Sequence, residues 1–226
     1  MSQPLRLVIL YNALIMKRII SILATALCVL TASAQIRIAT PGTELILKAD
    51  VGAEPQIQYF GERLSDTDVA NLQAAGVPNH NAYPAYGLWC ASEASLGVTH
   101  SDGNMSTVLR VESVTQTDEP TAKVTRIKMK DTVYPFYVTL CYRAYQDVDM
   151  IETWTEIENL EKKPVVLTRF DSGYLPLRAG DVWISHLHGT WAAEGLLVQE
   201  PLDRGMRVIK NKDGARNSHT DHSEVM

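Results

Sequence analysis

Between residues 35 and 180 the chain is a succession of short runs rich in Val, Ile, Thr, Tyr and Phe, separated by Gly, Pro and Asp. Runs of this length, bounded by turn residues, are typical of antiparallel strands in a β-sandwich. The predicted strands are 36–40, 44–49, 56–60, 95–100, 105–112, 122–129, 134–145, 150–158 and 165–173. The pattern therefore predicts an all-β fold, an antiparallel sandwich of two sheets with one short helix.

The clearest predicted hairpin has a four-residue loop, Gln146–Asp149. With that loop, Arg143 lies opposite Glu152, and Val138 lies opposite Ile157. Because successive side chains point to opposite faces of a strand, one face of the hairpin carries most of its apolar side chains and is predicted to face the core. This face consists of Phe136, Val138, Leu140, Tyr142, Thr153, Thr155 and Ile157.

Trp154 lies on the opposite, charged face of the same hairpin. An indole in that position either covers a neighbouring sheet or meets another domain, and we favour the first.

Two short sequence patterns between the predicted strands indicate a turn and a helix. Ser101–Asn104 contains Asp-Gly-Asn, residues that tolerate positive φ, and predicts a hairpin flanked by His100 and Met105. Ser65 with Asp68 three residues later predicts the start of a short helix that ends at Gly76.

Residues 1–34 differ from the rest because they contain three basic residues and no acidic one. Two of the bases precede an apolar run, Ile19–Leu30, and an Ala-Ser-Ala sequence ends at Ala34, which is the order of a secretory signal peptide. The run is too short to span a membrane. We therefore expect cleavage after Ala34, a mature domain 35–226, and a periplasmic or secreted protein without a membrane anchor. An over-extended gene start, with the initiator at Met16, explains the residues ahead of the signal.

Charge and cysteine content exclude some function classes. The formal net charge is −5, from 21 Lys and Arg against 26 Asp and Glu, whereas a nucleic-acid-binding surface is basic.

Cys90 and Cys141 remain after removal of the leader, which contains Cys28. Export would permit a disulfide between them, but we favour two buried thiols. Two cysteines cannot complete a four-thiolate zinc site.

Candidate chemical residues have ordinary structural explanations. His186 and His188 share one face of a predicted strand, as two ligands of a metal would, but no third ligand is evident. His219 and His222 lie in a polar terminal stretch and are interpreted as a solvated loop. We therefore expect no metal and no cofactor.

Known catalytic patterns are also missing from the sequence. The acidic pairs Glu156/Glu158 and Asp147/Asp149 are interpreted as sheet-face and loop charge rather than as the carboxylates of a glycosidase. The sequence has no G-x-S-x-G, G-x-G-x-x-G or phosphate-loop motif. Trp183 and Trp191 flank Gly189, and exposed indoles of this kind can pack on the C–H face of a sugar.

Seven short segments, in this order and spacing, carry a resemblance to a known family. They are Tyr59–Leu64, Ala82–Gly87, Val98–Asn104, Tyr134–Phe136, Leu140–Tyr145, His188–Glu194 and Gly214–Ser218. Over Ile36–Met226 the chain resembles the N-terminal sandwich domain of glycoside hydrolase family 36 α-galactosidases of exported bacterial enzymes. The resemblance implies a large two-layer sandwich, a supersandwich, followed in complete enzymes by a catalytic (β/α)8 barrel and a small C-terminal β domain.

The resemblance also assigns roles. In this family two aspartates on the barrel hydrolyse α-galactosides with retention, so this chain is expected to be inactive alone, with no catalytic residue of its own. Its expected roles are to support the barrel, to wall the sugar pocket and to mediate contacts in a homo-oligomer. Trp191, in Gly189-Thr190-Trp191, matches the family's pocket tryptophan. Some members add an Asp after a Tyr-Pro pair, but here Ala85-Tyr86-Gly87 follows Tyr83-Pro84, so no Asp is assigned.

Two other functions stay open at the level of sequence. One is a free-standing galactoside-binding module in which Trp154, Trp183 or Trp191 forms an exposed platform. The other is a sugar epimerase of the mutarotase type, which shares the large sandwich and uses His with Glu as acid and base. Its candidate residues are His100, His186 and Glu194.

Overall fold

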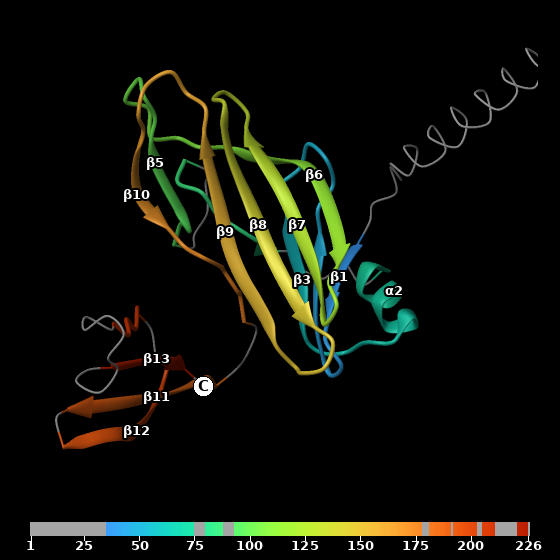
Figure 1. Cartoon of the computed structure of the whole chain (residues 1–226), viewed down its shortest axis with the longest axis vertical. Helices are drawn as coiled ribbons and strands as arrows, with labels where there is room; N and C mark the ends of the chain where they lie inside the picture. The colour runs from blue at the N-terminus through green and yellow to red at the C-terminus, as the bar shows by residue number, and fades with distance from the viewer. Residues whose placement is uncertain are drawn as a thin grey trace, which may run out of the picture. The chain divides into compact units, whose positions relative to one another are not determined.

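The chain is all-β with one helix in the parts that the computed structural model describes, residues 35–74, 80–87, 93–177, 181–190, 192–202, 205–210 and 221–225. The strands are β1 (Gln35–Ala39), β2 (Thr43–Lys48), β3 (Gln56–Glu62), β4 (His80–Asn81), β5 (Leu96–Thr99), β6 (Leu109–Asp118), β7 (Ala122–Asp131), β8 (Phe136–Tyr145), β9 (Ile151–Asn159), β10 (Val166–Phe170), β11 (Trp183–Thr190), β12 (Ala193–Pro201) and β13 (Asp221–Val225) (Figure 1). The helix is α2 (Asp66–Ala74). The predicted signal peptide lies outside the described residues.

The chain divides into two compact units, Met1–Pro176 and Leu177–Met226. The first unit contains two four-stranded antiparallel sheets, with strand orders β1-β2-β3-β4 and β6-β7-β8-β9, and a two-stranded sheet of β5 and β10. The second unit contains a three-stranded antiparallel sheet with the order β12-β11-β13. Within the described ranges, no helix has the length and apolar character needed to cross a membrane.

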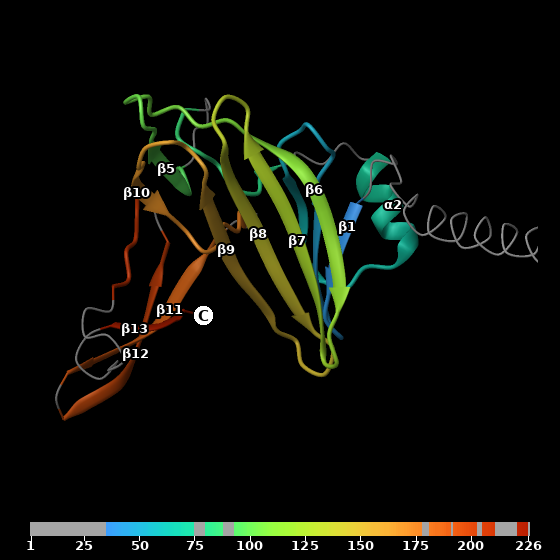
Figure 2. The ribbon, with the colours of Figure 1, turned by 45° about the horizontal axis from the view of Figure 1, so that its top comes forward.

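The two four-stranded sheets of the first unit face each other across one apolar core. In Figures 1 and 2, β1 and β3 lie behind β6–β9. Ile38 and Leu47 come from one sheet, and Met129 and Phe136 come from the other, yet all four belong to the same cluster of buried side chains. Two sheets joined by a shared core are consistent with the predicted sandwich.

The predicted β8–β9 hairpin is confirmed in register and in the facing of β8. Arg143 pairs with Glu152 and Val138 with Ile157, as the four-residue loop requires. The β8 side chains predicted to face the core are buried, and those are Phe136, Val138, Leu140 and Tyr142. Opposite them, Ile157 is partly buried and packs against the core cluster.

The hairpin predicted at Ser101–Asn104 is wrong, although the turn itself is present. Gly103 has a φ of 91°, and the turn is closed by hydrogen bonds from the His100 amide to the Asn104 carbonyl (2.8 Å) and from the Gly103 amide to the His100 carbonyl (2.9 Å). Before the turn, β5 pairs with β10, and after it β6 starts only at Leu109 and pairs with β7. The turn therefore passes the chain from one sheet to another.

The start of the predicted helix is confirmed. The Asp68 amide donates to Ser65 Oγ (3.2 Å), and the Ser65 hydroxyl donates to the Asp68 carboxylate (2.6 Å), so the two residues cap α2 reciprocally. Arg37 of β1 pairs with the fully buried carboxylate of Glu44 and also with Asp66 in the first turn of the helix. The predicted helix end at Gly76 lies outside the described residues.

The second unit contains one strand that the sequence predicted and two that it did not. β11 includes the predicted strand through His186 and His188. β12 pairs with it over most of its length, from Trp183 opposite Pro201 to Thr190 opposite Ala193, and β13 pairs with its other edge.

Candidate functional site

The candidate sugar contact, Trp191, lies outside the described residues, so its pocket role stays a prediction. It stands between the ends of β11 and β12, where the next residue, Ala192, has a φ of 62°. Trp183 begins β11 and is 61% exposed. Of the two tryptophans around Gly189, the described one is therefore open to solvent.

His186 and His188 occupy alternate positions of β11, as predicted for two imidazoles on one face. His186 is buried, and its Nε2 lies 3.9 Å from a carboxylate oxygen of Glu200. Glu200 also pairs with Arg207 at 2.6 Å. Among the residues that the structure describes, no three His, Cys, Asp or Glu side chains form a group that could hold a metal ion. His219 and the side chains of His222 and Glu194 lie outside the described part.

His100, the third candidate for epimerase chemistry, is held in a buried network of the first unit. Its Nδ1 lies 2.8 Å from Glu161 Oε1, and its Nε2 lies 3.0 Å from Thr107 Oγ1. The ring stacks on Tyr134 with a centroid distance of 3.8 Å and meets the edge of Phe136. A general base must reach its substrate with a free ring nitrogen. Because both nitrogens of His100 are already used, its place in the structure favours a role in folding.

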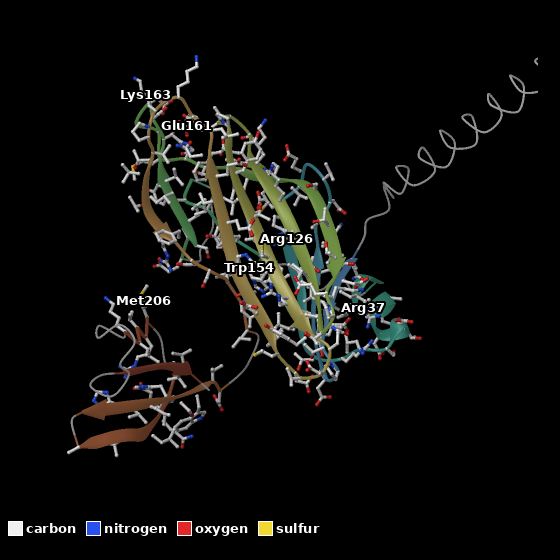
Figure 3. All side chains as sticks on the ribbon, in the orientation of Figure 1. Arg37, Arg126, Trp154, Glu161, Lys163 and Met206 are labelled. Atoms are coloured by element: carbon white, nitrogen blue, oxygen red, sulfur yellow. The ribbon has the colours of Figure 1, made fainter. Side chains whose placement is uncertain are left out.

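Glu161 belongs to the segment that follows β9 and completes this network. It is labelled in Figure 3. Burial acts to raise the pKa of Glu161, but hydrogen bonds from His100 and from the hydroxyl and amide of Ser101 outweigh it and hold the pKa below its ordinary value. A carboxylate with a lowered pKa stabilises the fold at neutral pH, and this stabilisation is lost as the pH falls through the lowered pKa. The free energy of unfolding is therefore expected to decrease when acid protonates Glu161 in this network.

Trp154 lies among charged side chains of its own sheet. Its packing on a neighbouring sheet stays a prediction. The guanidinium carbons of Arg143 and Arg126 lie 5.1 Å and 5.8 Å from its ring centroid, and its Nε1 donates to Glu156 at 3.1 Å (Figure 3). Cation–π contacts of this kind occupy the indole. Trp154 is consequently a poor sugar platform.

Cys141 lies between Arg126 and Trp154 in the strand register. It is a buried free thiol, and burial raises its pKa to about 12. A thiol with so high a pKa is unreactive at neutral pH. Cys90, with which Cys141 would form the alternative disulfide, lies outside the described residues.

The first unit contains a half-open cavity of about 440 Å³ between strands of its two facing sheets. It is lined by Thr43, Leu45, Phe60, Tyr142, Asp149, Ile151, Thr153, Ser172, Gly173, Tyr174 and Leu175. The residues come from β2, β3, β8 and β9, from the loop after β8, and from the segment after β10. Sequence reasoning placed Tyr142 in the core and Asp149 in a loop but did not bring them together.

Comparisons with known proteins agree with this fold. The family model described as the glycosyl hydrolase family 36 N-terminal domain matches residues 53–226. A double variant of the α-galactosidase AgaA from Geobacillus stearothermophilus, solved with stachyose, superposes with a TM-score of 0.73 at 21% identity, over 83% of this chain and 30% of that one. The α-galactosidase from Lactobacillus brevis gives 0.71 at 20% identity, with the same two shares.

A third solved structure, the galactosidase domain of the α-galactosidase–sucrose kinase AgaSK, gives a TM-score of 0.72 at 20% identity, over 85% of this chain and 32% of that one. At these identities the superpositions establish the fold alone. The chain spans about a third of the length of each of these structures. No curated protein matches the chain.

Proposed function

Because the chain belongs to the family of glycosyl hydrolase family 36 N-terminal domains, we propose that it is the non-catalytic N-terminal part of an α-galactosidase. The observation that carries the proposal is the match of the family model over residues 53–226. The similar solved structures named above, all with α-galactosidase in their descriptions and about three times as long as the matched region, support it.

The proposed partner is a catalytic (β/α)8 barrel that belongs to the same enzyme. A barrel of this type takes about 250 residues, and a retaining glycosidase needs two carboxylates about 5 Å apart. We assign both carboxylates to the barrel. The chain itself folds as part of a supersandwich that supports the barrel and walls one side of its sugar pocket.

The exposed apolar surface of β10 supports a contact of this kind. Val166 is 61% exposed and Phe170 is 65% exposed, and Leu167 between them is also open to solvent. Among the described residues, β10 pairs only with β5, so one of its edges is open. Apolar side chains on an open edge strand are typical of a surface that another part of a protein covers. We therefore propose that β10 lies against the remainder of the enzyme.

We further propose that the protein is exported after cleavage of residues 1–34. The charged start, apolar run and Ala-Ser-Ala end of this segment support the proposal. The N-terminal sequence of the exported protein tests it, since cleavage leaves Gln35 first, and a retained leader would contradict it.

Trp191 is the residue of this chain that we assign to the sugar pocket. In the complete enzyme that carries this chain, Trp191→Ala is expected to lower kcat/KM for an aryl α-galactoside about tenfold, because truncating a tryptophan that packs on a ligand removes a large contact. Steady-state kinetics measures the effect.

Trp183→Ala is the matched control for this measurement. Trp183 is a tryptophan of the same β11–β12 region and is exposed, so its loss is expected to leave kcat/KM unchanged. Equal kcat/KM values for wild type and Trp191→Ala would remove Trp191 from the pocket.

A further inference from the structure

The cavity of the first unit has the size of a small-ligand site. Its volume of about 440 Å³ falls within the range of about 300–1,000 Å³ that such sites occupy. Its walls combine the aromatic rings of Phe60, Tyr142 and Tyr174 with the hydroxyls of Thr153 and Ser172. All of these residues belong to the first unit.

The Tyr142 hydroxyl is a polar group for which the described residues supply no hydrogen-bond partner. Tyr142 is only 6% exposed, yet its hydroxyl makes no hydrogen bond with any residue that the structure describes. The hydroxyl oxygen is not one of the buried side-chain atoms that lack a hydrogen-bond partner, so it opens into the cavity that Tyr142 lines. A ligand in this cavity can therefore exchange hydrogen bonds with it.

Asp149, which also lines the cavity, supplies a hydrogen-bond acceptor with a fixed orientation. Its Oδ1 accepts hydrogen bonds from the Gly42 amide (2.5 Å) and the Thr40 hydroxyl (2.8 Å). These bonds, first from Gly42 and then from Thr40, hold the pKa of Asp149 below its ordinary value, so the carboxylate is ionised. These bonds and a further one with the Thr43 backbone orient the carboxylate beside the cavity that it lines.

The chemistry of these walls selects the class of ligand. A phenol offers a donor, a fixed carboxylate offers an acceptor, and aromatic rings offer flat apolar surfaces. Asp149 is the one charged side chain among the described residues that line the cavity, and hydrogen bonds from Gly42 and Thr40 already hold it, so the site does not demand a charged ligand. A ring with hydroxyl groups on its edge can bond to the phenol and to the carboxylate. The C–H bonds on the faces of the same ring can pack on the aromatic side chains.

We propose that this cavity binds a neutral saccharide of one or two rings, with Tyr142 and Asp149 as its polar contacts. The site requires neither the barrel nor Trp191. It is therefore independent of the proposed function, and its test uses binding to this chain alone.

Binding is tested by NMR titration of the ¹⁵N-labelled chain with D-galactose and, separately, with raffinose. Saturable shifts at millimolar sugar, confined to residues around the cavity, are the expected result. Tyr142→Phe keeps the ring and removes the hydroxyl, so it is expected to weaken binding about fivefold to tenfold. Tyr137→Phe is the matched control, since Tyr137 lies on the other face of the same strand beside Lys128.

A second readout separates ligand binding from a structural role for the hydroxyl. Without sugar, Tyr142→Phe is expected to unfold at the same urea concentration as wild type, because the hydroxyl makes no hydrogen bond with the described residues and opens into the cavity. Three results would overturn the proposal: no saturable shift with either sugar, equal binding by Tyr142→Phe and wild type, or a lower urea midpoint for Tyr142→Phe in the absence of sugar.

Discussion

Replacing His100 by alanine is expected to lower the free energy of unfolding by about 3 kcal/mol, the cost of leaving a buried carboxylate without one of its hydrogen-bond partners. The His100 side chain is fully buried, and that of Glu161 is 4% exposed. Without the imidazole, the Glu161 carboxylate keeps the amide and the hydroxyl of Ser101 as donors. Urea unfolding followed by circular dichroism measures the change.

The double variant His100→Ala with Glu161→Ala is the control for this prediction. Removing the carboxylate as well abolishes the unpaired charge, so the combined loss is expected to be smaller than the sum of the two single losses. Strictly additive losses would mean that the two side chains do not act as a pair.

Phe136→Ala is expected to cost about 3–5 kcal/mol through the cavity it leaves in the core. Phe136 is fully buried on the inner face of β8 and belongs to the cluster that both four-stranded sheets share. Its ring also meets the edge of His100, so the two substitutions are expected to be non-additive. Urea unfolding of the single and double variants measures both effects.

Val133→Ala is the matched control for Phe136→Ala. Val133 lies in the turn before β8 and is 76% exposed, so its truncation is expected to change stability by less than about 0.5 kcal/mol. A Phe136→Ala loss as small as that of Val133→Ala would contradict the shared core between the sheets.

Local patterns in the sequence predict the local parts of this fold. The β8–β9 register follows from a four-residue loop and the alternation of side chains, and both signals lie within one short segment. The cap of α2 follows from Ser65 and Asp68 for the same reason. The turn at Gly103 was also predicted, because turn chemistry depends on neighbouring residues.

Pairing between distant strands could not be predicted in this way. Four other strands, β6 to β9, separate β5 from β10 in the sequence, and nothing within Leu96–Thr99 specifies Val166–Phe170 as its partner. The same limit applies to Trp154. Its place on the charged face was predicted, but its contacts with Arg126 and Arg143 depend on which strands flank β9.

The cavity residues illustrate the limit for sites. Tyr142 was predicted to face the core, and a tyrosine in an otherwise apolar row is a signal that its hydroxyl needs a partner. Asp149 and Phe60 carry no such signal, because they reach the same cavity from a loop and from another sheet. The family was identified from the order of short segments, whereas the pocket role of Trp191 stays a prediction.

The most direct test of the account is an assay of the purified chain with an aryl α-galactoside. Because we propose that the chain is the non-catalytic part of its enzyme, we expect release of the aryl group no faster than in buffer alone. Turnover that disappears when a residue of this chain is substituted would contradict it, because the chemistry would then lie within the sandwich itself.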